Sequence, residues 1–114
     1  MKEVTITLNS GKEIGFKLSS GDIANLEERL KKPFMDILAE VSITNCANLI
    51  KYMRRYEVPN FGQNDAYDLL DELIESGYTY NDIYRKIIAQ VCVKSGVLSE
   101  SDLSRAESQI DEKN

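Results

Sequence analysis

The sequence predicts an α+β fold in which an N-terminal β-hairpin packs on a bundle of about five short helices. Two runs of alternating apolar and polar residues lie within residues 3–18, and such alternation is typical of half-buried strands. Apolar residues at helical spacing then recur in five stretches, each bounded by capping residues, glycine or proline. The chain has 114 residues, which is the size of one small domain.

The hairpin is expected over residues 3–18, with a turn that contains Gly11. One face is apolar and consists of Val4, Ile6, Leu8, Ile14, Phe16 and Leu18. An isolated hairpin is only marginally stable in water, so we expect this face to pack on the helices at 20–31 and 43–56. Its two edges carry unpaired backbone groups unless another segment covers them.

The five helices are expected at about residues 20–31, 33–41, 43–56, 65–76 and 80–95. Their starts are indicated by Ser19 with Asp22, by Pro33, by Ser42, by Asn64 or Asp65, and by Thr79 with Asp82. Their apolar stripes are Ile23, Leu26 and Leu30; Phe34, Ile37, Leu38 and Val41; Cys46, Leu49, Ile50 and Met53; Ala66, Leu69, Leu70, Leu73 and Ile74; and Ile83, Ile87, Val91 and Cys92. Gly77 and Gly96 mark the ends of the last two helices.

Residues 1–98 are therefore expected to form a single domain. Residues 99–114 hold five acidic and two basic residues, which is a net charge of −3 out of −5 for the chain. We expect this acidic tail to be weakly helical or disordered.

Composition argues against several classes of function. A net charge of −5 and a pI near 4.8 disfavour nucleic-acid binding, which usually needs a basic surface. The chain has no apolar run of about eighteen residues, so we expect no membrane span. Met1 leads directly into the strand pattern without an apolar signal segment, and we expect a cytoplasmic protein.

No constellation for catalysis or cofactor binding is present, so an enzyme is not expected. The chain has no histidine and only two cysteines, which removes the commonest general base and leaves too few ligands for a zinc site. No glycine-rich phosphate loop occurs. Cys46 and Cys92 are expected to be buried free thiols. Four acids are expected to form a solvated face of the fourth helix: Asp68, Asp71, Glu72 and Glu75.

Aromatic residues are unevenly distributed along the chain. All six tyrosines lie between Tyr52 and Tyr84, and tyrosine suits protein interfaces because it joins a large apolar ring to a polar tip. The candidate partner-binding residues are Tyr52, Tyr56, Phe61, Tyr80 and Tyr84. The alternative is that these rings only line the rim of the core, with their hydroxyls in water.

The stretch "VTITLNSGKEIGFKLSSGDIANLEERLKKPFMDIL" resembles the N-terminal part of the tail assembly chaperones of long-tailed phages and of gene transfer agents. The hairpin leads into Leu26-Glu27-Glu28-Arg29-Leu30, and a later helix carries Asp68-Leu69-Leu70-Asp71-Glu72-Leu73-Ile74. The resemblance covers roughly residues 4–95 and lies in element order and residue character. The chain departs from the pattern at the end of the third helix, where relatives often carry a tryptophan and this chain has none.

The resemblance implies a non-enzymatic role in tail morphogenesis. Such chaperones bind the tape measure protein, help to recruit tail tube subunits, and are absent from the mature virion. The implied partners are therefore the tape measure and tail tube proteins, with a possible homo-oligomer through a hairpin edge. The main alternative is a small acidic adaptor or regulator that binds one folded protein partner, and a nucleic-acid-binding regulator and an enzyme are more remote alternatives.

Overall fold

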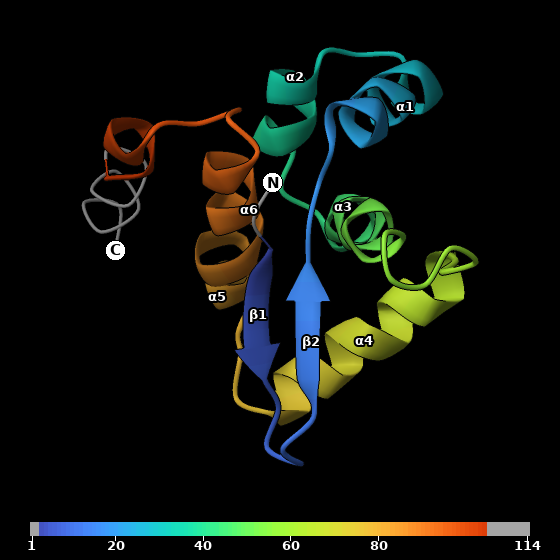
Figure 1. The fold of residues 1–114 in the computed structure, drawn as a ribbon, viewed down its shortest axis with the longest axis vertical. Coiled ribbons are helices and arrows are strands. Elements are labelled where there is room, and N and C mark those ends of the chain that lie inside the picture. The colour runs from blue at the N-terminus through green and yellow to red at the C-terminus, as the bar shows by residue number, and fades with distance from the viewer. Residues whose placement is uncertain (1–2, 105–114) are drawn as a thin grey trace.

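The computed structural model describes residues 3–104 and has an α+β fold, as the sequence predicts. A two-stranded antiparallel hairpin precedes a set of short helices (Figure 1). The elements are β1 (Val4–Thr7), β2 (Glu13–Phe16), α1 (Ser20–Leu30), α2 (Phe34–Ala39), α3 (Ile43–Arg54), α4 (Gln63–Glu75), α5 (Tyr80–Asp82), η1 (Ile83–Ile88) and α6 (Ala89–Lys94). No helix in this part of the chain is long and apolar enough to cross a membrane.

The hairpin turn sets the register of the two strands. Gly11 has φ of 90°, its N–H donates to the carbonyl of Leu8, and the Leu8 N–H donates to the carbonyl of Lys12. A residue other than glycine would be strained at that φ. The register pairs Val4 with Phe16 and Ile6 with Ile14, which places the predicted apolar residues on one face.

The hairpin is a lid on the helical core. Leu8, Ile14, Phe16 and Leu18 are buried, and Val4 and Ile6 are partly buried against the same core. The outer edge of β2 is covered by the end of α3. The Lys17 N–H donates to the Met53 carbonyl at 3.0 Å, and Arg54 donates to the Gly15 carbonyl at 2.7 Å. The expected contact with the third helix is therefore confirmed.

The helix starts confirm most of the capping signals. The Ser19 and Asp22 side chains form a capping box at α1, and Thr79 and Asp82 form another at α5. The Ser42 hydroxyl accepts from the Asn45 N–H at 3.0 Å. The expected cap at Asn64 or Asp65 is wrong, because α4 follows Gly62 directly and Asp65 lies within its first turn, accepting from the Gly62 N–H at 2.8 Å.

Two apolar positions assigned to helix stripes are exposed, and three others, Ile23, Leu30 and Leu38, are partly buried. The second helix ends at Ala39, because Glu40 takes an extended conformation, and Val41 therefore lies outside the helix with 73% of its surface exposed. Ile74 is 39% exposed near the end of α4. The other residues of the fourth stripe are buried.

The helix expected at 80–95 is divided into three segments. Between α5 and α6 lies η1, a π-helix. A π-helical turn is wider than an α-helical one, and Ile83, Ile87 and Ile88 of this segment are buried. The apolar stripe predicted the buried positions of this region correctly but gave no signal for the π-helical turn.

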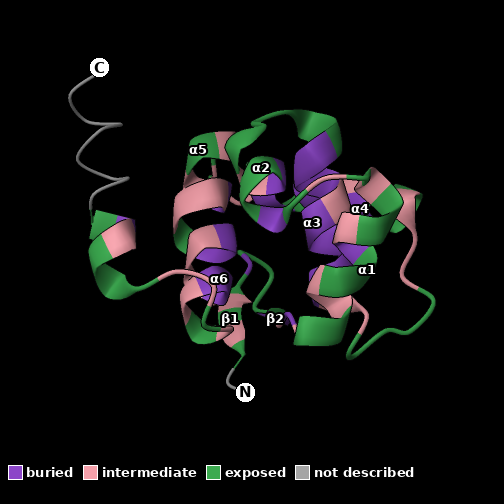
Figure 2. Cartoon of the chain, turned by 90° about the horizontal axis from the view of Figure 1, so that it is seen from above, coloured by how far each residue is buried: buried purple, intermediate pink, exposed green. Residues whose placement is uncertain are grey.

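The helices form two groups with α2 between them, and buried residues lie on α2 and on both groups (Figure 2). One group is α1, α3 and α4, and the other is α5, η1 and α6 (Figures 1 and 2). Beyond α6 the chain is helical over residues 100–104, where the Ser99 hydroxyl accepts from the Asp102 N–H at 3.1 Å. The rest of the expected acidic tail, 105–114, lies outside the described residues.

Candidate functional site

Helix α3 positions most of the candidate aromatic residues. Its stripe of Cys46, Leu49, Ile50 and Met53 is completely buried, so the helix is fixed against the core along its whole length. The five candidate residues do not form one surface. Tyr52, Tyr56 and Phe61 lie at the C-terminal end of α3, whereas Tyr84 reaches the N-terminal end of that helix, where its hydroxyl donates to the Ser42 carbonyl at 3.4 Å.

Two arginines contact the aromatic residues at the C-terminal end of α3. Arg54 lies over the Phe61 ring at 5.8 Å, and Arg55 lies over the Tyr52 ring at 4.8 Å while its Nε–H donates to the Phe61 carbonyl at 3.2 Å. Tyr52 is only 5% exposed, so it presents little area of its own. A cation over an aromatic face stabilises both side chains, and this group is therefore well ordered.

Tyr56 joins this group to the hairpin. Its hydroxyl donates to the Glu3 carboxylate, and the Lys17 ammonium lies 5.6 Å from its ring centroid. Burial, followed by the hydrogen bond to Glu3, raises the pKa of Tyr56. A side chain at Gly15 would displace the Tyr56 hydroxyl and the Glu3 carboxylate from their present positions, so the tip of the Tyr56 side chain lies directly against this residue of β2.

The other two candidate residues are Tyr80 and Tyr84, of which Tyr84 reaches the N-terminal end of α3. Both are partly exposed. The capping box at Thr79 fixes the start of α5 and thereby positions both rings. Burial is the main cause that raises the pKa of Tyr84 to about 12, so its phenol is neutral at physiological pH. The assignment of all five residues to partner binding stays a prediction.

A surface that sequence reasoning missed lies beside Tyr84. Met35 is 55% exposed, Val41 73% and Ile43 53%, and these three residues are called the 35–43 patch below. Val41 and Ile43 flank Ser42, the residue that contacts Tyr84. The signal available in the sequence was the pair of β-branched apolar residues on either side of a capping serine. Such residues cannot both enter the core from a helix start.

The Asn45 side chain fixes the backbone under this patch. Its Nδ2 donates to the carbonyls of Ile37 at 2.6 Å and of Glu40 at 2.8 Å, and Asn45 is only 4% exposed. A buried amide that satisfies the carbonyls at a helix end holds the following residues in one conformation. Val41 therefore lies on a connection that the Asn45 amide fixes, whereas Met35 and Ile43 lie on α2 and α3 at either side of it.

The remaining candidate chemistry does not assemble into a reactive site. Burial raises the pKa of both Cys46 and Cys92 to about 12, so both thiols stay protonated and unreactive at neutral pH. The four acids of α4 are exposed, as expected for a solvated face. Within residues 3–104 no group of three or more acidic or cysteine side chains is placed to hold a metal ion.

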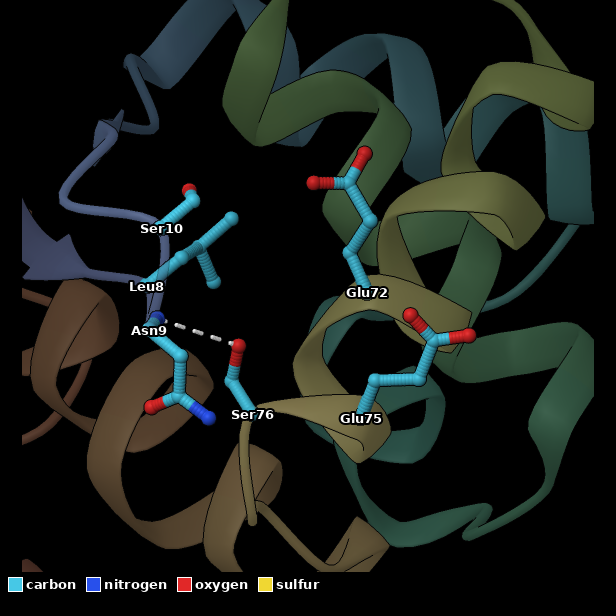
Figure 3. A pocket seen from close by; sticks show the side chains of 6 residues that line it. All are labelled: Leu8, Asn9, Ser10, Glu72, Glu75 and Ser76. Carbon is cyan, nitrogen blue, oxygen red and sulfur yellow. Dashed lines mark hydrogen bonds between the residues drawn. The ribbon is translucent and has the colours of Figure 1, made fainter.

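A cavity of about 280 Å³ lies between the hairpin turn and the end of α4 (Figure 3). It is lined by Leu8, Asn9, Ser10, Glu72, Glu75 and Ser76. The Asn9 N–H donates to the Ser76 hydroxyl at 3.4 Å, which connects the hairpin turn to α4. The two carboxylates stand along one side of the cavity on α4, and they do not converge on one point (Figure 3).

No protein-family model, curated protein or solved structure matches this chain. Among the described residues, large apolar and aromatic side chains are exposed at Met35, Val41, Ile43 and Tyr56.

Proposed function

We propose that the protein is a non-enzymatic tail assembly chaperone of a phage or prophage, which binds the tape measure protein and helps to recruit tail tube subunits. The observation that carries the proposal is the exposure of the three apolar side chains named the 35–43 patch, two of which flank Ser42, the residue that Tyr84 contacts. Soluble proteins bury most of their large apolar side chains, and a group that is more than half exposed is typical of a contact surface.

The chemistry of this patch fits an amphipathic helix. Met35 and the two β-branched residues offer an apolar surface, and the tyrosines add rings whose hydroxyls stay in water. A long amphipathic client needs its apolar stripe covered until the tail tube replaces the cover. A patch of three apolar side chains gives a moderate affinity, which such a displaceable cover requires.

Self-association is part of the proposal. Along an antiparallel ladder, residue pairs that are hydrogen-bonded to each other alternate with pairs that are not. The Leu8 N–H donates to the Lys12 carbonyl, so Leu8 and Lys12 are a hydrogen-bonded pair and the neighbouring pair, Thr7 and Glu13, is not. The N–H groups of Thr5 and Thr7 consequently point away from β2, toward the outer edge of β1. With the edge of β2 covered by α3, we place the contact between copies at the edge of β1, which pairs with the same edge of a second copy.

The client half of the proposal is tested by co-expression with a tape measure protein of a long-tailed phage. The full-length chain is expected to co-purify with the tape measure protein. The double change Val41→Ser and Ile43→Ser is expected to abolish co-purification and to leave the melting temperature unchanged. Ile74→Ser is the matched control, since it removes an exposed apolar group from α4. Unchanged capture by the double variant, or equal loss in the control, would refute the role of the patch.

The assembly half is tested by light scattering. The wild type is expected to form dimers or larger assemblies at concentrations of tens of micromolar, roughly the range in which weak interfaces are seen. Thr7→Pro removes one outward N–H without breaking the ladder, and it should shift the protein toward monomer. A monomeric wild type, or full assembly of Thr7→Pro, would contradict pairing at the edge of β1.

A further inference from the structure

Three cationic side chains meet around Tyr52 in a chain whose net charge is −5. The Lys51 ammonium lies 5.4 Å and the Arg55 guanidinium 4.8 Å from the centroid of the Tyr52 ring. Arg29, in the last turn of α1, lies near enough to repel the Lys51 charge. An open cavity of about 380 Å³ lies here, and it is lined by Asn25, Glu28, Arg29, Tyr52 and Arg55.

Lys51 lacks a counter-charge. It is only 3% exposed, yet no ion pair or hydrogen bond of its ammonium, or of the Arg29 guanidinium, occurs within residues 3–104. Burial, then the charges of Arg29 and Arg55, lower the pKa of Lys51. Like charges that lie close together repel one another, so an anion bound beside Arg29, Lys51 and Arg55 would stabilise the arrangement.

The guanidinium of Arg55 is already oriented. Its Nε–H donates to the Phe61 carbonyl, and its plane lies over the Tyr52 ring. Holding the donor in place before the ligand arrives reduces the entropy lost on binding. Arginine also binds carboxylates through two parallel N–H groups, which lysine cannot do.

We propose that the cavity lined by Arg29, Tyr52 and Arg55, with the Lys51 ammonium close to the Tyr52 ring, binds the carboxylate of an acidic side chain on a partner protein. A singly charged ligand is favoured over phosphate groups, since Glu28 lines the same cavity and the acidic chain repels polyanions. The site lies at the opposite end of α3 from the 35–43 patch, so it is independent of the proposed client surface. It implies that the partner is an acidic segment.

The test is an NMR titration of the full chain with an alanine-based helical peptide that carries glutamates at i, i+4 spacing. The backbone amides of Arg29, Lys51 and Tyr52 are expected to shift. The same peptide with glutamine in place of glutamate should leave them unmoved. Arg29→Gln or Arg55→Gln should weaken binding about tenfold, the loss expected when one hydrogen bond to a charged group is removed.

Lys94→Gln is the matched control, because it removes one positive charge from an exposed site on α6. It should bind the peptide as the wild type does. Arg29 is exposed, so its substitution leaves the fold intact, and melting temperatures verify this. Equal weakening by Lys94→Gln, or no shift at the three amides, would overturn the site. Inorganic phosphate that binds more tightly than the glutamate peptide would overturn the carboxylate assignment.

Discussion

The substitution Phe16→Ala probes how the hairpin is joined to the helices. Phe16 is completely buried, it is paired with Val4 across the ladder, and it lies between Gly15 and Lys17, whose backbone groups bond to α3. Truncating the ring therefore leaves a cavity at the contact between the hairpin and the core, where the hydrogen bonds to α3 limit how far the backbone can collapse into it.

The expected loss is about 3–5 kcal/mol, the range for phenylalanine to alanine in a packed core. A domain of this size has a total stability of about 5–15 kcal/mol, so the variant would be marginal. With about 4 °C of melting temperature per kcal/mol, the melting temperature should fall by about 12–20 °C.

Thermal unfolding followed by far-ultraviolet circular dichroism measures this directly. Ile6→Ala is the matched control, because Ile6 is on the same face of the hairpin but only partly buried. Ile6→Ala should lower the free energy of unfolding by only about 1 kcal/mol, because folding removes less of the Ile6 side chain from water. If Phe16→Ala melted within about 4 °C of the wild type, a loss of about 1 kcal/mol, the hairpin would not be a lid on the core.

Three further predictions concern the thiols and a cap. The thiols have pKa values near 12 in the folded protein and 9.0 when exposed, so between pH 9 and 12 only the thiols of the unfolded protein ionise. The free energy of unfolding should therefore be independent of thiol ionisation below pH 9. Above pH 9 it should fall by about 1.4 kcal/mol per thiol and pH unit. Denaturant titrations should show a shallower fall for Cys46→Ala, and an identical slope would contradict burial of that thiol. Cys46→Ser with Cys92→Ser should keep tape-measure binding at reduced stability, and loss of binding with the melting temperature retained would reveal a role for a thiol. Ser42→Ala should cost about 1 kcal/mol in denaturant unfolding, and no cost would mean that the Ser42 hydroxyl is not a functioning cap.

The sequence was sufficient to predict elements whose signals are local. The alternation around Ile14 and Phe16, and the hydroxyl caps Ser19, Ser42 and Thr79, depend on residues within one turn or strand of each other. The structure agrees with all of them. The start of α4 was misjudged because Gly62 has no side chain to cap with, so the signal came from Asp65 inside the first turn.

Features that depend on packing between distant elements could not be predicted. The spacing of Tyr52 and Tyr84 gave no information on where α5 lies relative to α3, and the structure places these rings at opposite ends of α3. The basic pocket brings Arg29 from another helix to Lys51. The π-helical turn of η1 retains the same apolar stripe that an α-helix would show, so the sequence pattern does not distinguish the two.

We propose that the protein covers an apolar stripe of its client with the 35–43 patch. Hydrogen exchange of the full chain, measured with and without a tape measure fragment, tests it most directly. The account predicts slower amide exchange over residues 35–43 and 80–84 when the fragment is present, with little change along α4. Protection confined to α4 or the hairpin, or no protection at saturating fragment, would contradict it.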